Sequence, residues 1–124
     1  MSNLSTVEIK AFVPATNYAR SMAFYRALGF EVRSDMGDLA YLVVQNTSFL
    51  LQHYPQPQFA QHFQMHLLVE DVDAWHAHVL ASGVVDDFGI EVGSPEDQPW
   101  GMRDFVLFDP SGVLWRIAKN IRSA

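Results

Sequence analysis

The chain has 124 residues, eight basic against fourteen acidic side chains, a formal net charge of −6 and no cysteine. This length suits one domain, and an acidic balance without a Lys/Arg run argues against nucleic acid as a partner. The lack of cysteine excludes a disulfide framework, a thiolate nucleophile and a Cys-based zinc site. No apolar run approaches the roughly 20 residues that span a bilayer, and no signal peptide is visible, so we expect a cytoplasmic protein without a membrane partner.

The first half of the chain shows one helix pattern among strand patterns. Residues 7–14 alternate apolar and polar side chains, which predicts a half-buried strand. Thr16 or Asn17 can cap a helix over about 18–28, and Gly29 is placed to end it in the left-handed conformation. Three further short strands are predicted over 30–34, 39–45 and 48–54.

The second half repeats this order after a polar linker. Residues 55–62 contain two prolines and interrupt every periodic pattern. A strand over 63–69 and a helix capped by Asp71 follow, and Gly83 ends that helix. Further strands are predicted over 84–92, over 103–108 and after Asp109. The loop 93–101 shows no periodicity.

The repetition predicts an α+β fold with two tandem βαβββ modules, about 7–54 and 63–120, within a single domain 1–124. Such modules can form a curved mixed sheet around a concave ligand cavity, with the helices on the other face. The alternation then assigns side chains to the cavity face: Lys10, Phe12, Leu51, His53, Gln64, His66, Leu114 and Arg116.

Arg116 is a long cation within an otherwise apolar strand that follows the turn Asp109–Gly112. Such a side chain reaches solvent, pairs with an acid, or lines a cavity built for a negative ligand. Lys10 poses the same choice, with Glu8 as the nearest acid. Two cations in one groove together favour an anionic ligand, because the guanidinium fork suits a carboxylate.

Trp100 lies in the Gly- and Pro-flanked loop 93–101. A tryptophan in such a loop either packs down onto the core or forms a stacking wall for a planar ligand. Both interpretations stay open at this stage.

Three motifs resemble the vicinal oxygen chelate superfamily, which contains glyoxalase I, extradiol dioxygenases and bleomycin resistance proteins. They are Ser21-Met22-Ala23-Phe24-Tyr25 through Leu28-Gly29-Phe30, the helix entry Val69-Glu70-Asp71-Val72, and Asp109-Pro110-Ser111-Gly112 with the strand after it. Pro99-Trp100-Gly101 and the ending 114–120 are most similar to the bleomycin-resistance branch. The resemblance covers nearly the whole chain and implies the same two-module fold.

The resemblance also implies where a metal would bind. Enzymes of the superfamily hold a divalent ion with His and Glu from the first and last strands of each module. Those positions fall on Lys10, at or beside Leu51, on Gln64 and on Arg116, none of which is a good ligand. We therefore expect no metal, no other cofactor and no catalytic residue. The alternative is a lyase or dioxygenase with a displaced divalent metal at His53 and His66.

The sequence thus favours a small-molecule-binding protein that sequesters or senses a small aromatic or acidic ligand, with antibiotic resistance as one candidate role. Bleomycin is cationic, which disagrees with a groove that contains Lys10 and Arg116. Whether the protein is an enzyme stays open, with the poor ligand set favouring no. The resemblance implies a homodimer whose grooves are each finished by the partner. The expected ligand-binding residues are Lys10, Phe12, His53, Gln64, His66, Trp100 and Arg116.

Overall fold

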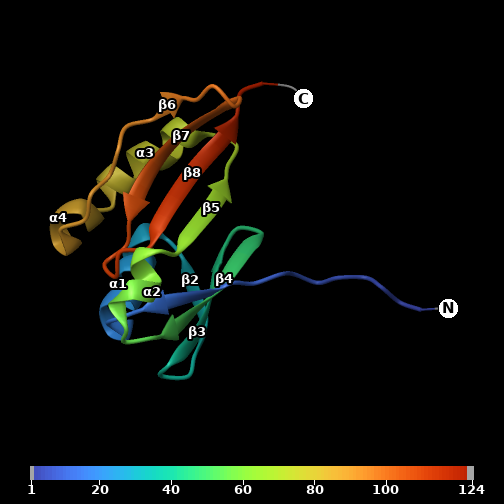
Figure 1. The fold of residues 1–124 in the computed structure, drawn as a ribbon, viewed down its shortest axis with the longest axis vertical. Coiled ribbons are helices and arrows are strands. Elements are labelled where there is room, and N and C mark those ends of the chain that lie inside the picture. Colours follow the sequence, from blue (N-terminus) through green and yellow to red (C-terminus); the bar gives the residue numbers. More distant parts are fainter. Residues whose placement is uncertain (1, 123–124) are drawn as a thin grey trace.

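The computed structural model describes residues 2–122 and contains two four-stranded mixed sheets with the same strand order (Figure 1). The first module consists of β1 (Phe12–Ala15), α1 (Tyr18–Leu28), β2 (Glu31–Asp35), β3 (Leu39–Val44) and β4 (Thr47–His53). The second consists of β5 (Gln64–Leu68), α3 (Val72–Ala81), α4 (Val84–Phe88), β6 (Glu96–Asp97), β7 (Met102–Phe108) and β8 (Leu114–Asn120), and the short helix α2 (Pro57–Gln61) precedes it.

The strand orders are β1-β4-β3-β2 and β5-β8-β7-β6. In each sheet the first and last strands of the module pair in parallel, and the other pairs are antiparallel. This arrangement confirms the predicted α+β class and its two repeated modules, while the predicted limits of the domain and of the linker stay predictions. None of the helices in residues 2–122 is long and apolar enough to span a membrane.

Both main helices begin where the sequence predicts, and α1 also ends there, whereas α3 ends at Ala81 with Ser82 as its C-cap and Gly83 precedes α4. Of the two candidate caps for α1, Asn17 is the one used, because its side chain accepts a hydrogen bond from the Arg20 N–H at 3.1 Å. Gly29 ends α1 with φ of 111°, a conformation that glycine adopts without steric cost. Asp71 caps α3 by accepting from the Ala74 N–H at 3.0 Å.

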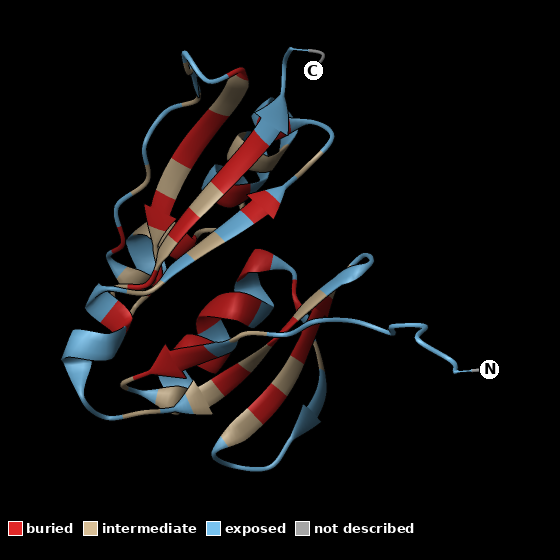
Figure 2. Cartoon of the chain, turned by 45° about the vertical axis from the view of Figure 1, so that its right-hand side comes forward, coloured by how far each residue is buried: buried red, intermediate tan, exposed pale blue. Residues whose placement is uncertain are grey.

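One continuous core joins the modules (Figure 2). Its centre is a cluster of aromatic rings in which Trp115 of β8 packs edge-on against Phe49 of β4 and tilts against Tyr25 of α1, at 5.3 and 5.7 Å between ring centroids. The Tyr25 hydroxyl donates to Asp109 and accepts from the Trp115 indole N–H. The turn before β8 is thereby tied to the first helix.

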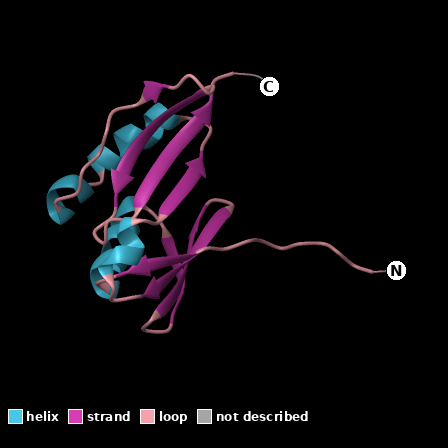
Figure 3. Ribbon diagram, viewed as in Figure 1, coloured by secondary structure: helices cyan, strands magenta, loops and turns pink. Residues whose placement is uncertain are grey.

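The predicted strand over 7–14 is wrong in its first half. Only Phe12–Ala15 pairs with β4; residues 8–11 lie beside the first sheet through contacts such as that of Glu8 with Ser48, and residues 2–7 form an arm that extends away from both sheets (Figures 1 and 3). Val7 is 97 % exposed and Ile9 95 % exposed, so neither faces a helix as expected. These residues alternate as a half-buried strand does, but nothing within residues 2–122 covers their apolar side.

The predicted strand over 84–92 is also wrong, because residues 84–88 form α4. Gly83 and Gly89 both have positive φ and bound this short helix, while Val84 is fully buried. Valine favours strands, but of Val84 and Val85 only Val84 enters the core. Within the linker, Pro57 occupies the first turn of α2, where its missing N–H costs nothing.

Candidate functional site

The candidate site is the face of β5, β8 and β7 that no helix covers, which we call the open face. Its members are Gln64, His66, Val106, Phe108, Leu114 and Arg116. The opposite side chains of the same strands, such as Leu67, Trp115 and Ile117, are buried in the core. Gln64, His66, Leu114 and Arg116 therefore lie on the side that the alternation predicted.

The pairing register brings three of these residues side by side. His66 is the direct partner of Arg116 across the parallel pair, and Val106 is its partner on the antiparallel side. Gln64 and Phe108 flank Leu114 in the same way, one step along the strands. The open face thus has two adjacent rows, one with two hydrogen-bonding side chains beside Val106 and one with two apolar side chains beside Gln64.

Arg116 pairs with an acid and also lies on the open face. The first of these placements agrees with the predicted ion pair, and the second leaves part of the side chain accessible to solvent. Its Nη1 donates to Asp104 Oδ2 at 3.0 Å, and Asp104 is 2 % exposed. The Gln98 side-chain amide donates to the other Asp104 oxygen at 3.0 Å. Asp104 engages one guanidinium nitrogen, which leaves the other N–H donors of Arg116 to solvent or a ligand.

Lys10 and Phe12 lie apart from this group, at the base of the arm and on the first sheet. Lys10 Nζ donates to Glu8 Oε1 at 2.9 Å and lies 4.8 Å from the centre of the Tyr41 ring. Hydrogen bonds from the Ser48 hydroxyl and from Lys10 lower the pKa of Glu8, and the Glu8 carboxylate raises the pKa of Lys10. Both groups are thus charged at neutral pH, and Lys10 is neutralised by its neighbour.

The assignment of Leu51 and His53 to the cavity face is wrong. Leu51 is fully buried, and the register pairs it with Val13 and pairs His53 with Ala15, both of them core-facing positions. His53 therefore shares the core-facing side of β4 and is exposed only because it ends the strand. The stretch 48–54 alternates weakly, and Phe49 fixes the side that is buried.

Trp100 occupies the turn between β6 and β7 and is 61 % exposed, so it is not packed down onto the core. Met102, which follows this turn, pairs with Asn120 at the end of β8. The distance along β8 from Asn120 back to Arg116 is roughly 13 Å at 3.3 Å per residue. Trp100 thus lies several residues along the strands from Arg116, and its part in a ligand site stays a prediction.

The residues at the metal positions of the superfamily do not fit a divalent ion. Lys10 and Arg116 are cations held by carboxylates, and Leu51 has no donor atom. His53 and His66 lie in different sheets, on strand faces of opposite kind. Within residues 2–122 no three His, Asp or Glu side chains form a group suited to an ion.

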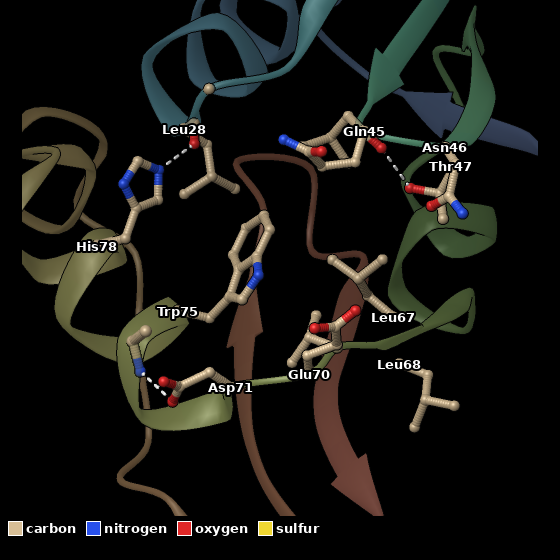
Figure 4. Close-up of a pocket in the computed structure, with 14 residues that line it drawn as sticks. Leu28, Gln45, Asn46, Thr47, Leu67, Leu68, Glu70, Asp71, Trp75 and His78 are labelled. Carbon is tan, nitrogen blue, oxygen red and sulfur yellow. Dashed lines mark hydrogen bonds between the residues drawn. The ribbon is translucent and has the colours of Figure 1, made fainter.

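A cavity of about 980 Å³ lies between the modules, away from the open face (Figure 4). It is bounded by the turn from Val44 to Thr47, by the end of β5 and by the start of α3, from which Trp75 points inward. His78 donates to the Leu28 carbonyl oxygen at 2.6 Å at its edge. None of the seven residues expected to bind a ligand lines this cavity. The sequence does not mark Trp75 as a cavity residue, because Trp75 lies on the same helix face as the buried Val72 and Val79.

Solved structures resemble this fold closely. A bleomycin-binding protein in complex with bleomycin is 24 % identical, with a TM-score of 0.80 over 93 % of this chain and 99 % of that one. The bleomycin resistance determinant of transposon Tn5 is 23 % identical, with a TM-score of 0.76 over 93 % and 98 %. TnmS3, an antibiotic binding protein from Streptomyces sp. CB03234, is 21 % identical, with a TM-score of 0.71 over 97 % and 99 %.

These likenesses concern the fold, and no curated protein matches the sequence. A family model decides the membership, because it matches residues 7–117, nearly the whole chain. The chain belongs to the Glyoxalase/Bleomycin resistance protein/Dioxygenase superfamily.

Proposed function

We propose that this protein binds a small planar organic molecule on its open face, without a metal. The observation that carries this proposal is the guanidinium of Arg116, which the buried Asp104 holds in place beside His66. A donor that is already oriented loses little conformational entropy when a ligand accepts from it. Similarity to proteins that bind bleomycin and another antibiotic supports a ligand-binding role over a purely structural one.

The charges around Arg116 define the polar end of the ligand. Asp104 neutralises one positive charge on the open face, and Glu8 neutralises Lys10 on the other sheet. The remaining Arg116 N–H groups and the His66 ring thus act as hydrogen-bond donors more than as a field of positive charge. This favours a ligand with one carboxylate, phenolate or carbonyl oxygen over a strongly charged anion.

The apolar row next to it defines the other end. Phe108 and Leu114 pair directly with each other, one step along the strands from Arg116. Both are half-buried, and they offer an apolar wall on which an aromatic ring can pack. Gln64, the partner of Leu114 on the other side, can bond to a polar substituent of that ring.

Isothermal titration of chelator-treated protein tests this proposal. The ligands are salicylate and benzoate, cyclohexanecarboxylate as the non-aromatic comparison, benzamidine as the cationic one, and bleomycin. Salicylate or benzoate is expected to bind best, and Arg116→Ala to weaken that binding by about 2 kcal/mol. Arg33→Ala is the matched control, because Arg33 pairs with the exposed Glu31 of its own strand, β2, in the other sheet.

Three results would refute the proposal. Equal affinities for wild type and Arg116→Ala would place the ligand elsewhere. Tighter binding of benzamidine than of benzoate would reverse the assigned charge of the ligand. Binding that appears only after addition of Mn²⁺, Ni²⁺ or Zn²⁺ would contradict the metal-free mode.

A further inference from the structure

One carboxylate on the open face is hidden from solvent. Asp104 of β7 pairs with Ala118 of β8, two residues beyond Arg116, so the Asp104 and Arg116 side chains lie on the same side of the sheet. The Asp104 side chain is 2 % exposed, whereas the Arg116 side chain is 33 % exposed. A ligand on the open face can therefore contact Arg116 but not Asp104.

Asp104 is held as an ionised carboxylate. Its Oδ2 accepts a hydrogen bond from Arg116 Nη1 at 3.0 Å, and its Oδ1 accepts one from the Gln98 side-chain amide at 3.0 Å. A carboxyl group that accepts on both oxygens has the pattern of its charged form, because the protonated form must donate from one of them. A buried negative charge thus lies behind the guanidinium that a ligand meets.

The turn that carries Gln98 has a well-defined backbone. The Gln98 N–H donates to the Met102 carbonyl oxygen at 2.6 Å, and the Gly101 N–H donates to the Gln98 carbonyl oxygen at 3.1 Å. The Ile121 N–H in turn donates to the Gly101 carbonyl oxygen at 3.0 Å, which ties the turn to the end of the last strand. The amide that holds Asp104 is therefore itself held in place.

A fixed charge behind a hydrogen-bond donor discriminates ligands by their own charge. Any oxygen acceptor can take the hydrogen bond from the guanidinium, whereas repulsion by Asp104 grows in proportion to the negative charge of the ligand. Water and salt screen a buried carboxylate less than an exposed one. A single ligand charge meets the guanidinium at close range, but each additional charge adds repulsion from Asp104.

We propose that Asp104 is the specificity-determining residue of the open face, and that it favours neutral and singly charged aromatic ligands over dianions such as aryl phosphates. Asp104 acts through Arg116 and does not touch the ligand. Because that ligand accepts from Arg116, the inference rests on the proposed function. The ion pair then has two separate roles, since Arg116 supplies the hydrogen bond and Asp104 sets the charge that the site accepts.

Three ligands with one ring and increasing charge test this proposal. They are benzamide, benzoate and phenyl phosphate, which carry no, one and two negative charges at pH 8. This pH also lies above the range in which histidine normally changes its charge. In calorimetry of the unmodified, chelator-treated protein, phenyl phosphate is expected to bind no tighter than benzoate.

Asp104→Asn removes the buried charge and keeps the shape of the side chain. Both hydrogen bonds can persist, because the Gln98 amide can turn over and accept from the new amide. Two charges roughly 7 Å apart at a hydrated surface change an affinity by about tenfold. Benzamide should therefore bind the variant unchanged, benzoate about tenfold tighter, and phenyl phosphate about a hundredfold tighter.

Two further variants separate the charge from the fold. Asp97→Asn is the matched control, because it removes the same charge from β6 of the same sheet, where Asp97 pairs with Arg103 and its side chain is 66 % exposed. All three affinities should then change less than about twofold. Asp104→Asn combined with Gln98→Glu exchanges the carboxylate and the amide between two bonded positions, and it should restore the discrimination against phenyl phosphate.

The measurement on the unmodified protein does not depend on the folding of any variant. Phenyl phosphate that binds this protein more than about tenfold tighter than benzoate would overturn the assignment of Asp104. Equal changes for the three ligands in Asp104→Asn would show that Asp104 only positions Arg116, and would overturn it as well. A failure of the proposed function is distinct, because benzoate would then bind wild type and Arg116→Ala equally or bind neither.

Discussion

Removal of a single hydroxyl group at the junction of the two modules should destabilise the protein strongly. Tyr25→Phe deletes the oxygen that donates to Asp109 Oδ2 at 2.5 Å and accepts from Trp115 Nε1 at 2.8 Å. All three side chains are at most 4 % exposed, so water cannot replace the lost partner. A buried polar group without a partner costs about 1–3 kcal/mol, so two such groups predict a loss of about 2–6 kcal/mol in the free energy of unfolding.

The same variant should change how stability depends on pH. Burial raises the pKa of Asp109, while hydrogen bonds from the Tyr25 hydroxyl and from the Val113 and Ser111 N–H groups lower it. Its pKa in the folded protein therefore lies above that of the unfolded chain, and stability falls as pH rises through this interval. Without the Tyr25 hydroxyl the folded pKa rises further. The stability difference between variant and wild type should thus be larger at pH 7 than at pH 4.

Urea denaturation at pH 4, 5.5 and 7, followed by circular dichroism, measures both effects. Tyr54→Phe is the control, since Tyr54 packs its ring on Phe59 near the surface and should change stability by less than about 0.5 kcal/mol. A loss below about 1 kcal/mol at pH 7 for Tyr25→Phe, or the same loss at all three pH values, would refute this account of the junction.

Two further substitutions test local features. Gly29 and Gly37 both have positive φ, but an added Cβ at Gly29 would lie 3.3 Å from His78 Nε2, whereas at Gly37 it meets open space. In urea denaturation, Gly37→Ala should lower the free energy of unfolding by about 1–2 kcal/mol, because its backbone conformation is strained for alanine. Gly29→Ala should lower it clearly more, because the added Cβ also crowds His78. Equal losses for the two variants would show that the His78 imidazole moves aside. Trp100→Ala should shift the melting temperature by less than about 2 °C, because the side chain is largely exposed, and a larger shift would contradict that placement. The same variant should bind aromatic acids more weakly in calorimetry if the β6–β7 turn contributes to the site, and unchanged affinity would confine the site to the open face.

The sequence predicts best where the information is local. Asn17, Gly29 and Asp71 mark helix ends through bonds to residues within one turn, and the structure places them there. The turn from Asp109 to Gly112 likewise forms through its own residues, since the Gly112 N–H donates to the Asp109 carbonyl oxygen at 3.0 Å. The strand after it alternates strongly enough to assign both of its faces.

The sequence predicts poorly those contacts that depend on the register between two strands. The partner of Arg116 is Asp104 on β7, and finding it requires the register between β7 and β8, which no single-strand pattern contains. The sequence pattern assigns Leu51 and His53 to the wrong face because β4 carries apolar side chains on both faces. The arm alternates like a half-buried strand, yet nothing within residues 2–122 covers Val7 and Ile9.

The bond between Tyr25 and Asp109 joins positions 84 residues apart, and Ser21 meets Ser111 across 90 residues. During synthesis on the ribosome, the first helix therefore emerges long before the turn that completes its buried contacts. The aromatic surface of the N-terminal half stays uncovered until nearly the whole chain has been made. During that time it can bind chaperones or aggregate. Chains that stop before Asp109 should consequently be recognised as incomplete by protein quality control.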